Sequence, residues 1–192
     1  MVILLIYVFL ISGKAESGKD TVANLIMKNS NCATNYNMHI ATSEKRIAVD
    51  DFGWDRQKDE KGRALLQMIG DGGRKYNPDI WINKFLRDLD GVLFLSQTKD
   101  KTLIVVPDVR YKNEVQKIAK WGEEKGEGVI ILTMRVERPN HENSLTEEQR
   151  NNSSEVDLDG WGYWDTLLTN DGTLQDLEVA VLNSMEVLGI DY

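Results

Sequence analysis

A glycine-rich turn directly after a long apolar run is the feature that most constrains this sequence. Residues 13–20 read Gly-Lys-Ala-Glu-Ser-Gly-Lys-Asp, which fits the phosphate-binding pattern G-x-x-x-x-G-K-[ST] except at its last position. The run Val2–Ile11 comes before the turn, and a helix with apolar residues on one face is expected over Lys19–Lys28. Strand, glycine-rich loop and helix in this order predict a phosphate site at the start of the helix.

The opening run has two other readings, a signal peptide and a membrane segment. It has no basic region before it and no small-residue cleavage site, and it is too short to span a bilayer. Cleavage at its end would also separate the glycine-rich turn from its supporting strand. We therefore interpret Val2–Ile11 as a strand buried on both faces, as parallel sheets require.

Strands and helices alternate along the rest of the chain. Further strands are predicted at Met38–Ala41, Thr102–Val106, Val129–Met134 and Thr166–Thr169. Asp55–Gly62 is expected to be a surface loop or a helix start. Helices are expected after a cap at Ser43, on both sides of a break at Gly70–Gly73, near Tyr111, and after a cap at Thr173.

Pro78 suits the first turn of the helix after that break, but the pattern leaves open whether this helix continues through Gly91–Leu95 or gives way to a strand. The alternation predicts one α/β domain over residues 1–192, a P-loop NTPase with a roughly five-stranded parallel sheet and helices on both faces. A polar stretch at about 135–162 is expected to be a mobile lid, or else a solvated insertion without function.

Composition limits the domain count and the partners. The chain has 192 residues, 41% of them apolar, which is enough for one core. Its only cysteine, Cys32, has no intrachain partner, which favours an unpaired thiol in a reducing cytoplasm. A formal net charge of -8 argues against nucleic acid or an anionic membrane as a partner, so an anionic ligand must be small and held locally.

The glycine-rich turn predicts an ATP site with Mg²⁺. Its glycines allow backbone amides to surround the β-phosphate, and Lys19 would bridge the β- and γ-phosphates as a catalytic point charge. Asp20 replaces the usual hydroxyl residue and would repel the phosphates unless a cation lay between them, so Asp20, Thr21 and Asp108 are the candidate metal ligands. Sequence does not decide between Asp20 and Thr21. The predicted ATP-binding residues are Gly13, Lys14, Ser17, Gly18, Lys19, Asp20, Thr21, Asn170 and Gly172.

The other candidates follow strands, because ligands of parallel sheets bind beyond the carboxyl ends of the strands. Asp108 could hold the metal or accept a proton, and Arg110 could clamp a phosphate with two donors, although both could also only support a turn. Glu114 lies one helical turn further and could orient Arg110. Arg135 and Arg138 lead into the lid and could stabilise the transferred phosphoryl group, or pair with nearby glutamates.

Several of these stretches together resemble the bacteriophage deoxynucleoside monophosphate kinases. They are ISGKAESGKDTVANLI, RALLQMIGDGGRKYNPDIWINKFL, VVPDVRYKNEVQKI and LLTNDGTLQDL, which cover most of the chain in order. The resemblance implies a nucleoside-monophosphate-kinase-like fold, dependence on ATP and Mg²⁺, a deoxynucleotide acceptor, dimerisation and a place in the host cytoplasm. It also implies that a helical segment at about 43–98 binds the acceptor.

Residue by residue, the resemblance assigns the acceptor to Arg63, Gln67, Gly70, Trp81, Asp108, Arg110 and Glu114. Arg63 would hold a phosphate, Gln67 would contact a base edge, and Trp81 would stack on the base unless it is a core residue. Arg74 and Lys75 are further basic candidates near the crevice, but a charged pair after two glycines is more often at the surface, so both stay outside the assigned set. The lid departs from the family, since residues 151–155 read Asn-Asn-Ser-Ser-Glu where a histidine shortly precedes a Ser-Glu pair, and His141 lies well upstream.

These observations favour a kinase that transfers the γ-phosphoryl group of ATP to a deoxynucleoside monophosphate. A P-loop kinase for another small acceptor, such as phosphomevalonate or dephospho-coenzyme A, is the first alternative, because the P-loop alone does not select the acceptor. A protein that binds ATP without transferring a phosphoryl group is the second. The paired arginines argue against it, since binding alone needs no acceptor clamp.

Overall fold

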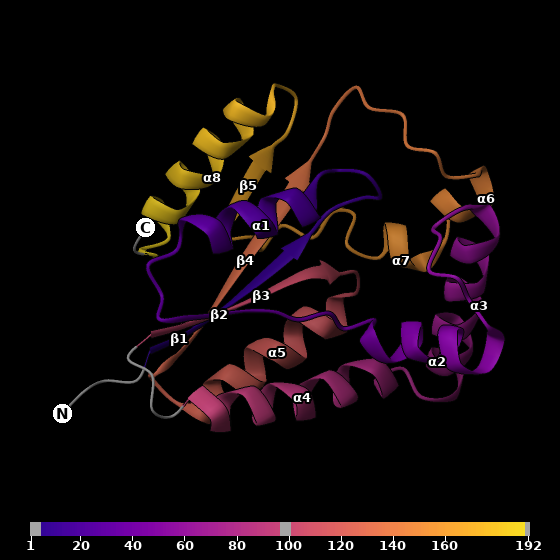
Figure 1. Ribbon diagram of the computed structural model, residues 1–192, viewed down its shortest axis with the longest axis horizontal. Helices are drawn as coiled ribbons and strands as arrows, with labels where there is room; N and C mark the ends of the chain where they lie inside the picture. The colour runs from indigo at the N-terminus through magenta and orange to yellow at the C-terminus, as the bar shows by residue number, and fades with distance from the viewer. Residues whose placement is uncertain (1–4, 97–100, 191–192) are drawn as a thin grey trace.

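The computed structural model describes residues 5–96 and 101–190, which form a five-stranded sheet with helices on both sides (Figure 1). All four strand pairings are parallel, in the order β2-β3-β1-β4-β5. The strands are β1 Leu5–Ser12, β2 Thr34–Asn37, β3 Lys101–Val109, β4 Val129–Glu137 and β5 Thr166–Thr169. The long helices are α1 Lys19–Asn29, α2 Thr42–Phe52, α3 Glu60–Tyr76, α4 Ile80–Ser96, α5 Lys112–Lys125 and α8 Leu174–Val187. The predicted fold class is therefore confirmed.

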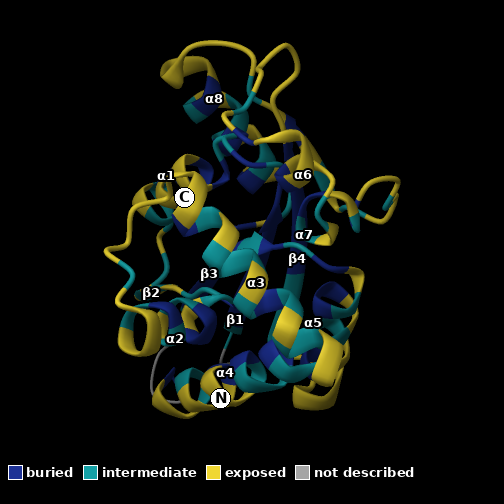
Figure 2. Ribbon diagram, turned by 90° about the vertical axis from the view of Figure 1, so that its right-hand side faces the viewer, coloured by how far each residue is buried: buried dark blue, intermediate teal, exposed yellow. Residues whose placement is uncertain are grey.

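Strand β1 lies at the centre of the sheet and separates two apolar cores. Phe9 and Ile11 face the core that α1 and α8 cover, whereas Val8 and Leu10 face the core under α4 and α5. These four side chains are fully buried, because β1 has a strand on each edge and helices on each face. Figure 2 shows the buried residues gathered along the strands. Residues 2–4 of the predicted first strand lie outside the described residues.

The second strand differs from its prediction. It is Thr34–Asn37, and Met38–Ala41 forms a turn instead. The backbone amides of Ile40 and Ala41 donate to the carboxylate of Asp108, so they are not available for a strand pairing. Helix α2 begins at Thr42, with Ala41 as its cap residue, so Ser43 is inside the helix and does not cap it.

The predicted break at Gly70–Gly73 is also wrong. Helix α3 runs through these glycines to Tyr76, and the chain turns at residues 77–79. Packing explains the continuity, since a Cβ at Gly73 would collide with the ring of Trp81 on α4. Pro78 lies before α4, which continues through Gly91 and ends at Ser96, and this answers the question that the sequence left open.

The carboxyl ends of the strands all point to the same edge of the sheet, and the functional candidates gather there. Helices α2 and α3 and the short helices α6 (Glu147–Arg150) and α7 (Ser153–Val156) lie beyond that edge (Figure 1). Helices α6 and α7 belong to the segment after β4 that was predicted to be a lid. No helix among residues 5–96 and 101–190 is long and apolar enough to cross a membrane.

Candidate active site

The glycine-rich turn forms a tight loop between β1 and α1. A Cβ at Gly13 would collide with Ser17 Oγ and lie 2.7 Å from the carbonyl oxygen of Val136. Gly18 has a φ of 95°, in the left-handed region that favours glycine, and caps α1. Ser17 Oγ is buried and has no hydrogen-bond partner among the described residues. The loop thus has the close packing that the phosphate-binding pattern requires.

Lys19 is held inside this loop. Its side chain is buried, and Nζ donates to the carbonyl oxygen of Lys14 at 3.3 Å. Burial, and then the charge of Arg110, lower the pKa of Lys19 to about 8. A cation that is desolvated in this way gains strongly from an arriving anion. The placement suits a group that binds phosphate.

The two candidate metal ligands on α1 face differently. Both residues are exposed, but Asp20 lines a cavity together with Lys19, whereas Thr21 lines neither of the two cavities at this edge of the sheet. Asp20 also occupies the position at which the phosphate-binding pattern has its hydroxyl residue. The structure therefore favours Asp20 over Thr21.

A first cavity, which we call the acceptor cavity, extends from Lys19 along α3. Six of the seven residues predicted to contact the acceptor meet there, although they come from two separate stretches of the chain, 63–70 and 108–114. From the predicted set, the lining contains Lys19, Asp20, Arg63, Gln67, Gly70, Asp108, Arg110 and Glu114. The structure adds His39, Glu44, Lys45, Lys58, Asp71, Arg74, Tyr111, Asn152, Ser154 and Glu155 as polar lining residues.

Asp108 uses both carboxylate oxygens to hold the turn before α2. Oδ1 accepts from the amide of Ile40 at 2.9 Å, and Oδ2 from the amide of Ala41 at 3.1 Å. Burial raises the pKa of Asp108, but interaction with His39 and Lys45 outweighs it and holds the pKa below its ordinary value. Asp108 is therefore a carboxylate whose oxygens are already engaged, and its predicted role as a metal ligand stays a prediction.

Arg110 is fixed at the junction of the P-loop and the lid. Its Nη1 donates to the carbonyl oxygens of Gly13 at 3.2 Å and Ser154 at 3.4 Å, and lies 2.7 Å from Glu155 Oε1. Glu114 does support Arg110, as expected, but through the backbone. Its Oε2 accepts from the amides of Arg110 at 2.7 Å and Tyr111 at 3.0 Å and so caps α5.

Trp81 is the one predicted acceptor residue that the structure places elsewhere. It is buried in the core beneath α3, and its Nε1 donates to the carbonyl oxygen of Gly70 at 3.0 Å. It does not line the acceptor cavity, so a stacking role on the acceptor does not fit this placement. The unbroken helix α3 is the reason, because the ring packs closely against Gly73 of that helix.

A second cavity lies on the other side of the P-loop. Its lining includes Lys14, Ser17, Arg135, Arg138 and His141. Arg135 is buried and donates to Ser12 Oγ at 2.9 Å, whereas Arg138 is exposed and donates to the carbonyl oxygen of Glu16 at 3.4 Å. Arg135, predicted to begin the lid, lies within β4 because that strand continues to Glu137, and Arg138 directly follows the strand. Both line the second cavity and neither lines the acceptor cavity.

The loop after β5 adjoins the P-loop as expected. Asn170 Nδ2 donates to the carbonyl oxygen of Ser17 at 2.9 Å and packs against Gly18. Gly172 lies in the same loop, two residues before the start of α8. Thr173 caps that helix, and its side chain accepts from the amide of Asp176.

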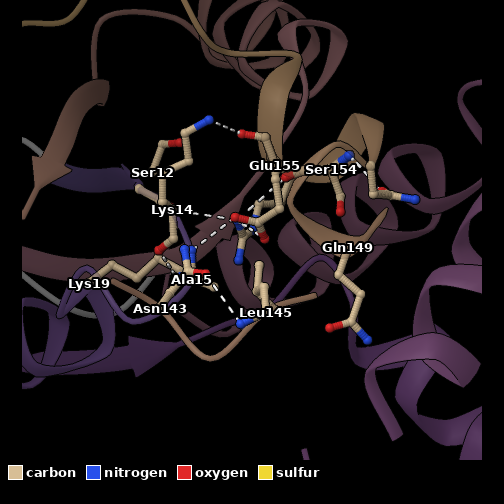
Figure 3. Close-up of polar contacts among 12 residues, drawn as sticks. Ser12, Lys14, Ala15, Lys19, Asn143, Leu145, Gln149, Ser154 and Glu155 are labelled. Atoms are coloured by element: carbon tan, nitrogen blue, oxygen red, sulfur yellow. Dashed lines mark hydrogen bonds and ion pairs between the residues drawn. The ribbon is translucent and has the colours of Figure 1, made fainter. Parts of the chain in front are cut away.

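Two glutamates of the site were not singled out from the sequence. Glu155 of α7 points toward the P-loop, and its Oε2 accepts from the amide of Ala15 at 2.9 Å (Figure 3). Glu16, at the tip of the P-loop with a φ of 62°, accepts from the amide of Ser144 and lies 3.2 Å from Arg63. Through these contacts the lid segment and α3 are both tied to the phosphate-binding loop.

Arg74 was a candidate near the crevice that the sequence left outside the assigned set. It lies in the acceptor cavity between the carboxylates of Glu44 and Glu114. The only signal in the sequence was its spacing from Arg63, Gln67 and Gly70, which places all four on one face of a helix. Nothing near Glu44 in the sequence marked it.

Comparison with known proteins identifies the fold. No family model matches the chain, and no curated protein matches it in sequence. Among solved structures, a dephospho-CoA kinase from Campylobacter jejuni matches with a TM-score of 0.52 and 10% identity, covering 96% of this chain and 98% of that one. A sugar kinase from Janibacter matches with a TM-score of 0.51 and 12% identity, covering 97% and 95%. A tunicamycin resistance protein from Deinococcus radiodurans matches with a TM-score of 0.50 and 15% identity, covering 92% and 94%. The chain therefore has the fold of the P-loop kinases.

Proposed function

We propose that this protein is an ATP- and Mg²⁺-dependent kinase whose acceptor is a nucleoside monophosphate, specifically a deoxynucleotide. The observation that carries the proposal is the arrangement of two cavities around one P-loop. Lys19 lies in the acceptor cavity with Arg63 and Arg110, and Ser17 lines the other cavity with Arg135 and Arg138. A donor on one side and an acceptor on the other would meet at the loop.

The residues at the P-loop fit the phosphates of ATP. The glycines keep the loop free of side chains that would fill it, and Lys19 is a desolvated cation at its end. The N-terminus of α1 adds the positive end of a helix dipole. In the proposed complex Lys19 neutralises charge on the transferred group, and Arg135 and Arg138 contact the donor when the lid closes.

The oxygen-bearing side chains near the P-loop also fit a magnesium ion that is held mainly by the substrate. No group of three or more His, Cys, Asp or Glu side chains able to hold a metal occurs within residues 5–96 and 101–190. Mg²⁺ commonly takes one or two carboxylates together with substrate phosphates and waters. Asp20 is the residue best placed to supply that carboxylate, with Thr21 and Asp108 as the remaining candidates. When bound, the ion would offset the negative charge that develops on the phosphates.

On the acceptor side, Arg63 and Arg110 would hold the acceptor phosphate in line with the donor. Both lie at the P-loop end of the acceptor cavity, next to Lys19. Holding two reactants in line is the main contribution a protein makes to phosphoryl transfer, so little covalent chemistry is required of the side chains. The kinases among the proteins of similar fold support phosphoryl transfer to a small molecule. The nucleotide acceptor is supported by the sequence resemblance.

A coupled assay of ADP release tests the proposal directly. The protein is incubated with ATP and Mg²⁺ and with each deoxynucleoside monophosphate in turn, and ribonucleotides and water serve as controls. We expect turnover that depends on a deoxynucleotide. ADP release with dephospho-coenzyme A or phosphomevalonate but with no nucleotide would establish the alternative acceptor class. ATP binding without any accelerated release would support the binding-only alternative. Dimerisation stays a prediction, which the mass of the protein in solution will test.

A further inference from the structure

An arginine and two glutamates meet in the acceptor cavity away from the P-loop. Arg74 Nη2 lies 3.2 Å from Glu44 Oε1 and 3.5 Å from Glu114 Oε1. Its guanidinium carbon lies 4.0 Å from the centre of the Tyr111 ring. Glu44 and Glu114 are only 7% and 2% exposed. We call these three charged residues the Glu44–Arg74–Glu114 cluster.

Arg74 and Glu44 lie beyond the phosphate end of the cavity, whereas Glu114 also accepts from the backbone amide of Arg110. Arg63 marks that end, because its Nη2 is 3.2 Å from Glu16 of the P-loop. A helix rises about 1.5 Å per residue, which places Gly70 roughly 10 Å and Arg74 roughly 16 Å along α3 from Arg63. An acceptor phosphate at Arg63 and Arg110 would thus leave the rest of the acceptor to extend toward Gly70 and the cluster.

Within the described residues, the side-chain hydrogen bonds of the cluster use Arg74 Nη2, Glu44 Oε1 and both oxygens of Glu114. Arg74 Nη1, a donor, and Glu44 Oε2, an acceptor, take part in none of these bonds. Both lie over Gly70, where a Cβ would come 2.8 Å from Nη1 and 3.4 Å from Oε2. Arg74, Glu44 and Gly70 all line the cavity. A donor and an acceptor that are free of these bonds therefore both lie on the cavity wall over Gly70, a residue that has no side chain.

The charge of the cluster indicates what kind of group it would accept. At the cluster, the carboxylates of Glu44, Glu114 and Asp108 face two cations, Arg74 and Lys45, so a second anionic group would be disfavoured there. Burial is the largest cause that raises the pKa of Glu44 and of Glu114 to about 7, and the Arg74 guanidinium opposes it. A neutral group with a donor and an acceptor on neighbouring atoms would satisfy both free atoms.

We propose that Glu44 and Arg74 are specificity-determining residues that bind the edge of the acceptor's base. Glu44 Oε2 accepts a hydrogen bond from a ring N–H or an amino group, and Arg74 Nη1 donates to the neighbouring carbonyl oxygen or ring nitrogen. The edges of the bases differ in the order of these groups, and proteins that bind an unpaired base distinguish it along that edge. The inference rests on the proposed function and adds the residues that select the base.

Kinetics with all four common deoxynucleoside monophosphates test this inference. We would measure kcat/KM for each one with the wild-type protein, Glu44→Gln and Arg74→Lys. The matched control is Asp50→Asn, an exposed residue on the same helix as Glu44. One specific pair of hydrogen bonds to a base discriminates by about tenfold or more. We therefore expect Glu44→Gln to change the ratio of kcat/KM between at least two bases by about tenfold, and the control to leave all ratios unchanged.

The possible outcomes separate the inference from the proposed function. Unchanged ratios, or an equal fall for all four bases, would mean that the cluster only supports the fold, while turnover by the wild type would still establish the kinase. If Glu44→Gln does not fold, Arg74→Lys decides, because it retains the charge between the carboxylates and loses the planar donor pair. If the wild type phosphorylates no nucleotide, the proposed function fails and this inference fails with it.

Discussion

Glu155 and Arg110 form an ion pair at the centre of the site, with Oε1 and Nη1 2.7 Å apart. The same carboxylate accepts from the amide of Ala15 in the P-loop, and the carbonyl oxygen of Glu155 accepts from Lys14 Nζ at 2.7 Å (Figure 3). One residue of the lid segment therefore contacts the phosphate-binding loop and the arginine assigned to the acceptor phosphate. In the proposed mechanism, closure of the lid and the position of Arg110 are coupled through Glu155.

We expect Glu155→Gln to lower kcat/KM by about tenfold to hundredfold. The substitution removes the negative charge of a buried, hydrogen-bonded pair and leaves the charge of Arg110 uncompensated. The variant should also speed up amide hydrogen exchange in residues 139–160, since the lid loses its charged contact with the P-loop. Steady-state kinetics and hydrogen exchange measure the two effects. Glu148→Gln, at an exposed position of α6, is the control. Wild-type kinetics in Glu155→Gln would show that the pair does not position Arg110.

Replacement of Lys19 should separate catalysis from folding. Lys19 is buried and its pKa is lowered to about 8, so its charge is costly in the folded state without a ligand. We expect Lys19→Met to lower turnover by at least about a hundredfold, as the loss of one charge-stabilising group does in other enzymes. Its thermal midpoint should equal or exceed that of the wild type. Lys28→Met, near the exposed end of the same helix, should retain activity, and turnover within tenfold of wild type in Lys19→Met would contradict the assignment.

The strands that the sequence predicted correctly are those with strong apolar patterns. Thr102–Val106 and Val129–Met134 lie within β3 and β4, and Thr166–Thr169 is β5 itself. Strand β2 was missed because its sequence, Thr-Asn-Tyr-Asn, is polar and it pairs with β3 alone at the edge of the sheet. The more apolar residues that follow it, Met38–Ala41, gave the stronger signal but turn to meet Asp108. Their backbone partners come from a distant part of the chain, and no local pattern contains that information.

Prediction of the site was limited in the same way, because contacts between distant parts of the chain leave no local pattern. The family resemblance predicted residues along the α3 wall of the acceptor cavity, namely Arg63, Gln67 and Gly70. It did not predict the Glu44–Arg74–Glu114 cluster, whose members come from three different helices. A charged residue on a helix is usually solvated, so only tertiary packing distinguishes Arg74 from a surface residue. The continuity of α3 through its glycines was likewise decided by packing against Trp81.

ATP binding should take up a proton near pH 8. The pKa of Lys19 is lowered to about 8 by burial and then by Arg110, and phosphates that contact the ammonium group would raise it again. A group whose pKa rises on binding takes up a proton, so ATP affinity should fall as the pH rises through 8. Calorimetry in two buffers with different ionisation heats measures the uptake. If the heat of ATP binding is the same in both buffers, and the Lys19→Met variant gives that same result, the prediction is wrong.

The stability of the protein should depend on the titration of Glu44. Burial raises its pKa from 4.5 to about 7, assisted by Asp108 and opposed by Arg74 and Lys45. Between these two values the folded protein holds a proton that the unfolded chain releases, so the contribution of Glu44 to stability is lost as the pH rises through 7. The amide that replaces this carboxyl group in the Glu44→Gln variant does not titrate, and Glu114 titrates in both proteins.

The difference between the thermal midpoints of Glu44→Gln and the wild type should therefore grow in favour of the variant from about pH 4.5 to 7 and remain constant above that. Thermal unfolding of both proteins, followed by circular dichroism across this range, measures the difference. Asp50→Asn serves again as the control, because that residue is exposed on the same helix. A constant difference across the range would mean that Glu44 titrates at its ordinary pKa, and the cavity would then be open to water at that carboxylate.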